Sequence, residues 1–122
     1  MAELTLHFIP ASGARYDGER DLRWRVLRQP LGHPRGSERF EFEDESMHLV
    51  ACDGDKVMGC VLFQPDRRGG GRLFQMAVDP SRQGQGVGRL LVLHLEDRLR
   101  RDGITDVTLH SRHHAVGFYE RL

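Results

Sequence analysis

The sequence lacks any long apolar run. None of its segments approaches the roughly 20 consecutive apolar residues that a membrane-spanning helix needs. The N-terminal region also lacks the basic segment followed by an apolar segment that is typical of a secretory signal peptide. These two absences predict a chain that works in the cytoplasm and has no membrane partner.

An excess of charge of either sign is also lacking. Lys and Arg together number 18, Asp and Glu together number 18, and the formal net charge is zero. Lys56 is the only lysine, so arginine supplies nearly all of the positive charge. A neutral chain creates no long-range field that would attract a polyanion, and we therefore expect no nucleic-acid partner.

Cysteine is scarce, with Cys52 and Cys60 as the only two. They flank residues 53–56, which read as a tight hairpin turn. That register would place Cys52 opposite Val57 and Cys60 opposite Leu49, so the two sulfur atoms would not meet. We expect both thiols to be reduced packing groups, because neither has the basic neighbours of a nucleophilic cysteine.

What is present is a chain of 122 residues with 39% hydrophobic and 30% charged residues, which predicts one globular domain over 1–122. Apolar periodicity and turn residues suggest its order of elements. We expect strand 4–9, helix 17–31, a polar loop or irregular helix at 32–46, strands 48–52, 57–63 and 72–78, helix 88–102, strand 107–109 and the start of a helix at 115–122. This order indicates an α+β fold with a mostly antiparallel twisted sheet flanked by helices.

The most specific segment lies between the strand that ends near Val78 and the long helix. Three alternating glycines, Gly84, Gly86 and Gly88, lead directly into that helix. Uncovered backbone N–H groups at a helix N-terminus favour an anion such as a diphosphate. A nucleotide-hydrolysing P-loop would need a Lys-Ser/Thr pair, and a dinucleotide fold would need Gly-x-Gly-x-x-Gly in a parallel unit. The sequence has neither.

Two segments give the chain a resemblance to the GNAT superfamily of N-acetyltransferases. Residues 83–88 read Gln-Gly-Gln-Gly-Val-Gly and follow Ala-Val-Asp-Pro at 77–80, while residues 115–122 read Ala-Val-Gly-Phe-Tyr-Glu-Arg-Leu. Both are similar to signatures of that superfamily and stand in the same order. Residues 22–28 and 42–48 also resemble its ElaA-like and YjcF-like branch.

The resemblance implies acetyl-CoA as cofactor and a fold whose sheet is splayed where coenzyme A enters. The glycine loop would hold the pyrophosphate, with Arg82 and Arg89 beside it, and the open backbone of the preceding strand would pair with the pantetheine arm. The implied cofactor-binding residues are Met76, Ala77, Val78, Arg82, Gln83, Gly84, Gln85, Gly86, Val87, Gly88 and Arg89.

The implied reaction is direct transfer of an acetyl group to a primary amine, carried by a small molecule or a peptide, in a ternary complex. Tyr119 would protonate the leaving thiolate. Glu43, Glu45 and His48 are the candidates for the base that deprotonates the amine, since they lie beside the presumed site. Arg112 stands where the superfamily often has Asn, which leaves open how the amine is held.

Two alternatives remain open at this stage. A non-catalytic module that binds acyl-CoA and regulates a partner would need the same glycine loop. The histidines at 110, 113 and 114 could ligate a metal, but no carboxylate or thiolate lies beside them in the sequence, so we expect none.

The superfamily pattern usually continues beyond Leu122 with a closing strand pair, so we expect either a protein that is short at its C-terminus or a sequence that is part of a longer protein. In the first case, the strand 107–109 would have an open edge. Since open edges invite pairing, a homodimer is possible.

Overall fold

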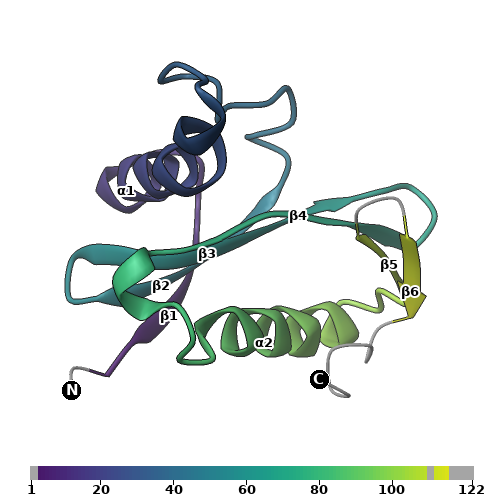
Figure 1. The fold of residues 1–122 in the computed structure, drawn as a ribbon. Coiled ribbons are helices and arrows are strands. Elements are labelled where there is room, and N and C mark those ends of the chain that lie inside the picture. The colour runs from purple at the N-terminus through teal and green to yellow at the C-terminus, as the bar shows by residue number, and fades with distance from the viewer. Residues whose placement is uncertain (1–2, 110–111, 116–122) are drawn as a thin grey trace.

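The computed structural model describes residues 3–109 and 112–115 of the chain. Its main elements form one twisted sheet with a helix on either side (Figure 1). In chain order they are β1 (Thr5–Ile9), α1 (Ala14–Arg23), β2 (Met47–Asp53), β3 (Lys56–Pro65), β4 (Gly70–Val78), α2 (Val87–Arg101), β5 (Asp106–Leu109) and β6 (Arg112–Ala115). The predicted α+β class with a mostly antiparallel sheet is confirmed.

The strands follow one another across the sheet in chain order, from β1 to β6. Neighbouring strands are antiparallel, except that β5 runs parallel to β4 because α2 carries the chain back between them. This crossover places the segment between β4 and α2 at one end of the sheet.

Each face of the sheet buries its own apolar cluster, because successive side chains of a strand point to opposite faces. One cluster lies between α2 and the sheet. There the α2 side chains Leu91, Leu95 and Leu99 pack on strand side chains such as Leu49 and Phe63. On the opposite face, below α1, the second cluster joins these residues: Leu22, Val50, Cys52, Val57, Cys60, Leu62 and Ala77.

The first helix is shorter than the prediction. The sequence pattern favoured one helix over 17–31, whereas α1 ends at Arg23 and continues as a π-helical turn, Trp24–Arg28, and a 3₁₀ turn, Gln29–Leu31. Pro30 and the left-handed Gly32 stop the helical run. Residues 32–46, which we call the connecting segment, then cross to β2 through turns, as the sequence predicted.

The prediction for the C-terminal region is partly wrong. The sequence suggested an open edge along 107–109, but β6 pairs antiparallel with β5 and covers it. Ala115, expected as the first residue of a helix, is the last residue of β6, and the rest of that expected helix lies outside the described residues. The argument for a homodimer through that edge therefore no longer holds.

The hairpin of β2 and β3 is one residue out of the predicted register beyond its turn. Cys52 does face Val57, but a β-bulge at Ala51/Cys52 places Cys60 opposite Val50 and not opposite Leu49. Both thiols are free and buried, as expected. Burial raises the pKa of Cys60, and this favours the unreactive thiol form.

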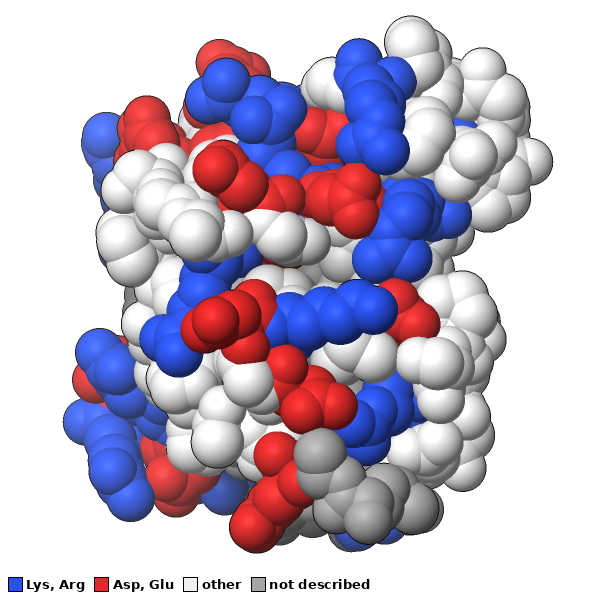
Figure 2. Space-filling model, turned by 90° about the vertical axis from the view of Figure 1, so that its left-hand side faces the viewer, with Lys and Arg blue, Asp and Glu red and all other residues white. Residues whose placement is uncertain are grey.

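The surface agrees with the balanced composition. Figure 2 shows basic and acidic side chains interspersed over one face of the molecule, with no large area of a single sign there. Within the described residues, no helix is both long and apolar enough to cross a membrane.

Candidate functional site

The sheet opens between β4 and β5. Their parallel pairing covers four residues of each strand, from Gly70↔Asp106 to Leu73↔Leu109. β5 ends at Leu109, the partner of Leu73, whereas β4 continues to Val78 (Figure 1). No described strand pairs with the edge of β4 from Phe74 to Val78 on that side. An unpaired strand edge presents N–H and C=O groups to any extended ligand.

A β-bulge interrupts β4 at the start of this open edge. Cys60 lies opposite Ala77 and Leu62 opposite Phe74, so β4 has one residue more than β3 over this interval. Gln75 takes a positive φ of 53°, and the Cys60 thiol donates a hydrogen bond to its carbonyl oxygen at 3.4 Å. A bulge re-aims the backbone groups of the strand, and functional sites often use one.

The loop after β4 is braced by its own side chains. The Asp79 carboxylate accepts hydrogen bonds from the backbone N–H and the hydroxyl of Ser81. Burial alone would raise the pKa of Asp79, but these bonds and the Arg25 guanidinium outweigh it and hold that pKa below its ordinary value. The side-chain amides of Gln83 and Gln85 donate to the carbonyl oxygens of Val78 and Ser81.

The glycines keep the end of this loop open. Gly84 and Gly86 have φ values of 79° and 80°, which glycine adopts without strain. A Cβ atom at either position would meet no atom within 4 Å, so the space outside the loop is free. Gly86 directly precedes α2, and no described side chain caps that N-terminus. The first amides of α2 are therefore available to an anion, with roughly half a positive charge from the helix dipole.

The two arginines expected beside the loop lie in different surroundings. Arg82 donates from Nη2 to the Asp53 carboxylate at 2.8 Å, which ties its side chain to the β2–β3 turn. It also lines the pocket that Gln85 and Gly86 border, so its place beside the pyrophosphate stays a prediction. Arg89, in the first turn of α2, is exposed.

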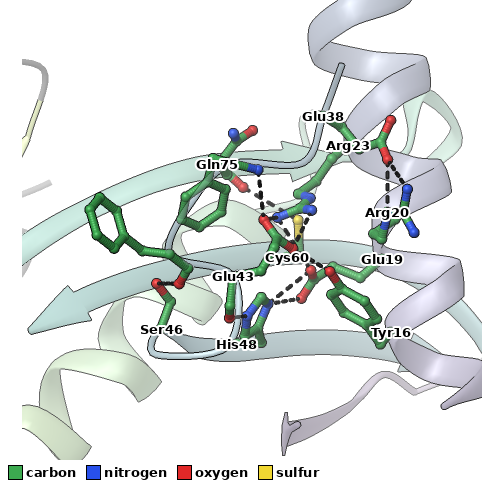
Figure 3. Close-up of polar contacts among 12 residues, drawn as sticks. Tyr16, Glu19, Arg20, Arg23, Glu38, Glu43, Ser46, His48, Cys60 and Gln75 are labelled. Carbon is green, nitrogen blue, oxygen red and sulfur yellow. Dashed lines mark hydrogen bonds and ion pairs between the residues drawn. The ribbon is translucent and has the colours of Figure 1, made fainter. Parts of the chain in front are cut away.

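A buried polar cluster lies between α1, the connecting segment and the sheet (Figure 3). At its centre Arg23, fully buried, donates from both terminal nitrogens to the Glu43 carboxylate, at 2.8 and 3.2 Å. The Tyr16 hydroxyl donates to the same carboxylate at 2.5 Å. Burial and Glu43 together raise the pKa of Tyr16 to about 12. Glu43, a candidate base in the sequence, is thus fully engaged inside the protein.

His48 belongs to the same cluster. Its Nδ1 lies 3.0 Å from the Glu19 carboxylate and its Nε2 lies 2.7 Å from the Glu43 carbonyl oxygen. The side chain is 1% exposed, so neither ring nitrogen is open to a substrate. The predicted role of His48 as general base therefore needs correction, because its position on β2 turns the ring into the interior.

The surroundings of His48 make the folded state sensitive to pH. Burial alone would lower its pKa, but the hydrogen bond and charge of Glu19 outweigh this and raise the pKa above 6.5. The stabilisation from the charged ring is therefore complete below pH 6.5 and is lost as the pH rises through the folded-state pKa. We expect the Tm to fall over that interval and His48→Gln to flatten the fall. An equally steep fall in His48→Gln, measured by thermal denaturation, would contradict this assignment.

The cluster could also be read as a metal site. One donor atom each from Glu19, Glu43 and His48 lie within 4.8 Å of one another. Arg23 already supplies positive charge to both carboxylates, with Nη1 lying 3.6 Å from the Glu19 oxygen, and both His48 nitrogens have partners. The donors are thus committed within the protein, and we assign no metal to them.

Of the other two predicted catalytic residues, the structure describes only Glu45. Glu45 is exposed on the connecting segment. Tyr119 lies outside the described residues. Sequence reasoning missed Glu19 and Arg23 as members of the buried cluster. A signal existed, because they are spaced i,i+4 on the helix face that also carries the buried Leu22, but such pairs are mostly exposed in helices.

Comparison with known sequences shows which family the chain belongs to. The sequence model of the acetyltransferase (GNAT) family matches residues 16–122, and the chain belongs to that family. The chain is 32% identical over 88 residues to the N-acetyltransferase YjcF of Bacillus subtilis (strain 168), an alignment that covers 72% of this chain and 62% of YjcF. It therefore spans less than two thirds of that relative's length.

Solved structures agree on the fold. An acyl-CoA N-acyltransferase from Pseudomonas aeruginosa superposes with a TM-score of 0.75 at 17% identity, covering 88% of this chain and 78% of that one. A Bacillus subtilis acetyltransferase in complex with CoA superposes with a TM-score of 0.65 at 18% identity, covering 88% and 64% of the two chains. The resemblance seen in the sequence is confirmed.

Proposed function

We propose that this chain is an acetyl-CoA-dependent N-acetyltransferase that transfers an acetyl group to a primary amine by direct attack in a ternary complex. The observation that carries the proposal is the juxtaposition of two backbone features. The N-terminus of α2, which no described side chain caps, and its glycine loop directly follow the edge of β4 with which no described strand pairs. Together they offer an anion site and an extended hydrogen-bonding edge to one long ligand.

The residues fit coenzyme A. The backbone amides from Gln83 to Arg89 would hold the pyrophosphate, because the loop is open and the helix dipole favours negative charge. The edge formed by Met76, Ala77 and Val78 would pair with the amide groups of the pantetheine arm as an added strand. When bound, acetyl-CoA supplies the activated acetyl group as a thioester.

The bulge of β4 supports the chemical step. An N–H group that the bulge re-aims would donate to the thioester carbonyl oxygen as negative charge develops there, a contribution of about 3–4 kcal/mol in comparable sites. Neither thiol is placed to attack the thioester, since both are buried, and this supports direct attack by the amine. Glu45, exposed on the connecting segment, is our candidate to receive the amine proton, directly or through water.

A calorimetric titration of the chain with acetyl-CoA tests the cofactor. We expect binding of acetyl-CoA and none of NADH or ATP, which also carry diphosphate groups but cannot extend along β4 as pantetheine does. Equal binding of all three compounds would show a site that binds diphosphates in general and does not select coenzyme A. Lack of binding would contradict the proposal.

The variant Tyr119→Phe separates an enzyme from a binding module. The family resemblance implies that the Tyr119 hydroxyl protonates the leaving thiolate, and loss of such a proton donor costs about 10²-fold or more in rate. We expect thiol release with an amine acceptor to fall by that factor while acetyl-CoA affinity stays within about twofold. Unchanged thiol release would remove Tyr119 from the mechanism. Binding without thiol release from any amine, in the unsubstituted chain, would favour the regulatory module.

A further inference from the structure

Arg23 is a fully buried charge that the proposed reaction does not use. Its side chain has no exposed area, and its Nε atom has no hydrogen-bond partner among the described residues. A buried ion pair is often no more stabilising than apolar residues of similar volume, so stability alone is a weak reason for an arginine here. A bidentate pair with a carboxylate, in contrast, fixes orientation.

The partner that Arg23 orients is the connecting segment. Besides its two bonds from Arg23, the Glu43 carboxylate accepts a hydrogen bond of 3.4 Å from the Phe40 backbone N–H. The Arg23 guanidinium also lies 5.9 Å from the centre of the Phe40 ring. One side chain of α1 thus holds the connecting segment at two of its residues (Figure 3 shows the Arg23–Glu43 contact).

The contact continues to the bulge of β4. The rings of Phe40 and Phe74 meet edge to face with their centres 4.6 Å apart, and Phe74 directly precedes Gln75, the residue of positive φ. Below them, Cys60 lies against the same cluster and donates to the Gln75 carbonyl oxygen. Phe40 is therefore the part of the connecting segment that reaches the interrupted end of the open edge.

The direction of the bound cofactor makes this end important. If the pyrophosphate lies at the glycine loop, beyond Val78, the pantetheine arm runs back along β4 and its acyl end reaches the bulge. The amine acceptor must arrive at that acyl end. On the α1 face of the sheet, the Phe40 ring packs against Phe74 at this place.

We infer that Arg23 is a positioning residue. Through its bidentate pair with Glu43 it holds Phe40 against Phe74, and it thereby shapes the part of the acetyltransferase site where the amine acceptor meets the acyl group. This inference rests on the proposed function and adds to it the element that receives the amine. Arg23 itself touches neither acetyl-CoA nor the amine.

Two phenylalanines of the connecting segment provide a matched test. Phe40 packs on Phe74, whereas Phe42 is 37% exposed. Thiol release from acetyl-CoA is measured with spermidine, kanamycin and an alanine-initiated peptide as acceptors. We expect Phe40→Ala to raise the acceptor KM about tenfold and to leave the acetyl-CoA KM within about twofold. Phe42→Ala should leave both constants within about twofold.

The variant Arg23→Lys tests the Arg23–Glu43 pair itself, because lysine keeps the charge but cannot make the bidentate contact. We expect a higher acceptor KM, an unchanged acetyl-CoA Kd, and faster tryptic cleavage after Arg35 and Arg39, two exposed residues of the connecting segment. The cleavage assay needs no acceptor. If Arg23→Lys fails to fold, as judged by circular dichroism, the phenylalanine pair still decides.

The possible failures are distinguishable. Equal acceptor KM values for Phe40→Ala and Phe42→Ala would overturn the inference while leaving the proposed function intact. A rise in the acetyl-CoA KM of Phe40→Ala without a rise in the acceptor KM would also overturn it. Absence of thiol release from the unsubstituted chain with all three amines would overturn the proposed activity, and this inference with it.

Discussion

Gly86→Glu should abolish acetyl-CoA binding, with a loss of affinity of at least about 100-fold. Gly86 has a φ of 80° and directly precedes α2. A glutamate there would strain the backbone by about 1–2 kcal/mol and would place a carboxylate where the helix N-terminus is proposed to hold the pyrophosphate. Calorimetric titration with acetyl-CoA measures the effect, and circular dichroism checks that the fold persists.

Gly69→Glu is the matched control for this variant. Gly69 has a φ of 81° and no atom within 4 Å of an added Cβ, so the strain and the added charge are the same. It lies in the β3–β4 turn, at the opposite end of β4 from the glycine loop. We expect its acetyl-CoA affinity to stay within about twofold of the unsubstituted chain. Equal losses in the two variants would show that strain or net charge, and not the loop, was responsible.

The second large effect is on stability. Arg23→Leu should lower the free energy of unfolding by about 3–5 kcal/mol, because it leaves the Glu43 carboxylate buried without a cation and leaves Glu19 with His48 alone. Denaturant titration at neutral pH measures the change. A stability of only about 5–15 kcal/mol is typical of single domains, so the loss amounts to about a fifth of the total or more.

Two comparisons locate the cause of that effect. Arg101→Leu removes an exposed ion pair with Asp97, whose side chains are 75% and 54% exposed, and should cost less than about 1 kcal/mol. The double variant Arg23→Leu with Glu43→Leu should recover part of the loss, because one stranded carboxylate is gone. If the double variant were less stable by the full sum of the single changes, the charge explanation would fail.

Local patterns predicted most of the fold. The strands β1 to β4 and helix α2 match their expected ranges closely, since each follows a simple apolar period and ends at Gly, Pro or Asp. The position of the glycine loop before α2 was also predictable, because it depends only on consecutive residues of the sequence. The open half of β4 followed from the family resemblance and not from any pattern in the strand itself.

Features that depend on distant contacts were not predictable in this way. The bulge at Gln75 exists only relative to its partner strand β3, and nothing in the residues of β4 reveals the extra residue. The sequence places His48 beside the presumed site, but Glu19 of α1 and the connecting segment bury it, and neither contact follows from a local pattern. The ion pair between Arg82 and Asp53 joins the glycine loop to another turn, and no local pattern indicates it.

The unpaired half of β4 has a consequence for how this protein can change over generations. If recognition of acetyl-CoA rests on main-chain groups of Met76 to Val78, substitutions of these side chains alter core packing more than cofactor affinity. Selection for a new amine acceptor can then change the connecting segment while the main-chain contacts to acetyl-CoA stay the same. Most substitutions on this strand leave its backbone N–H and C=O groups in place, proline being the exception, and this leaves acceptor preference as the more variable trait.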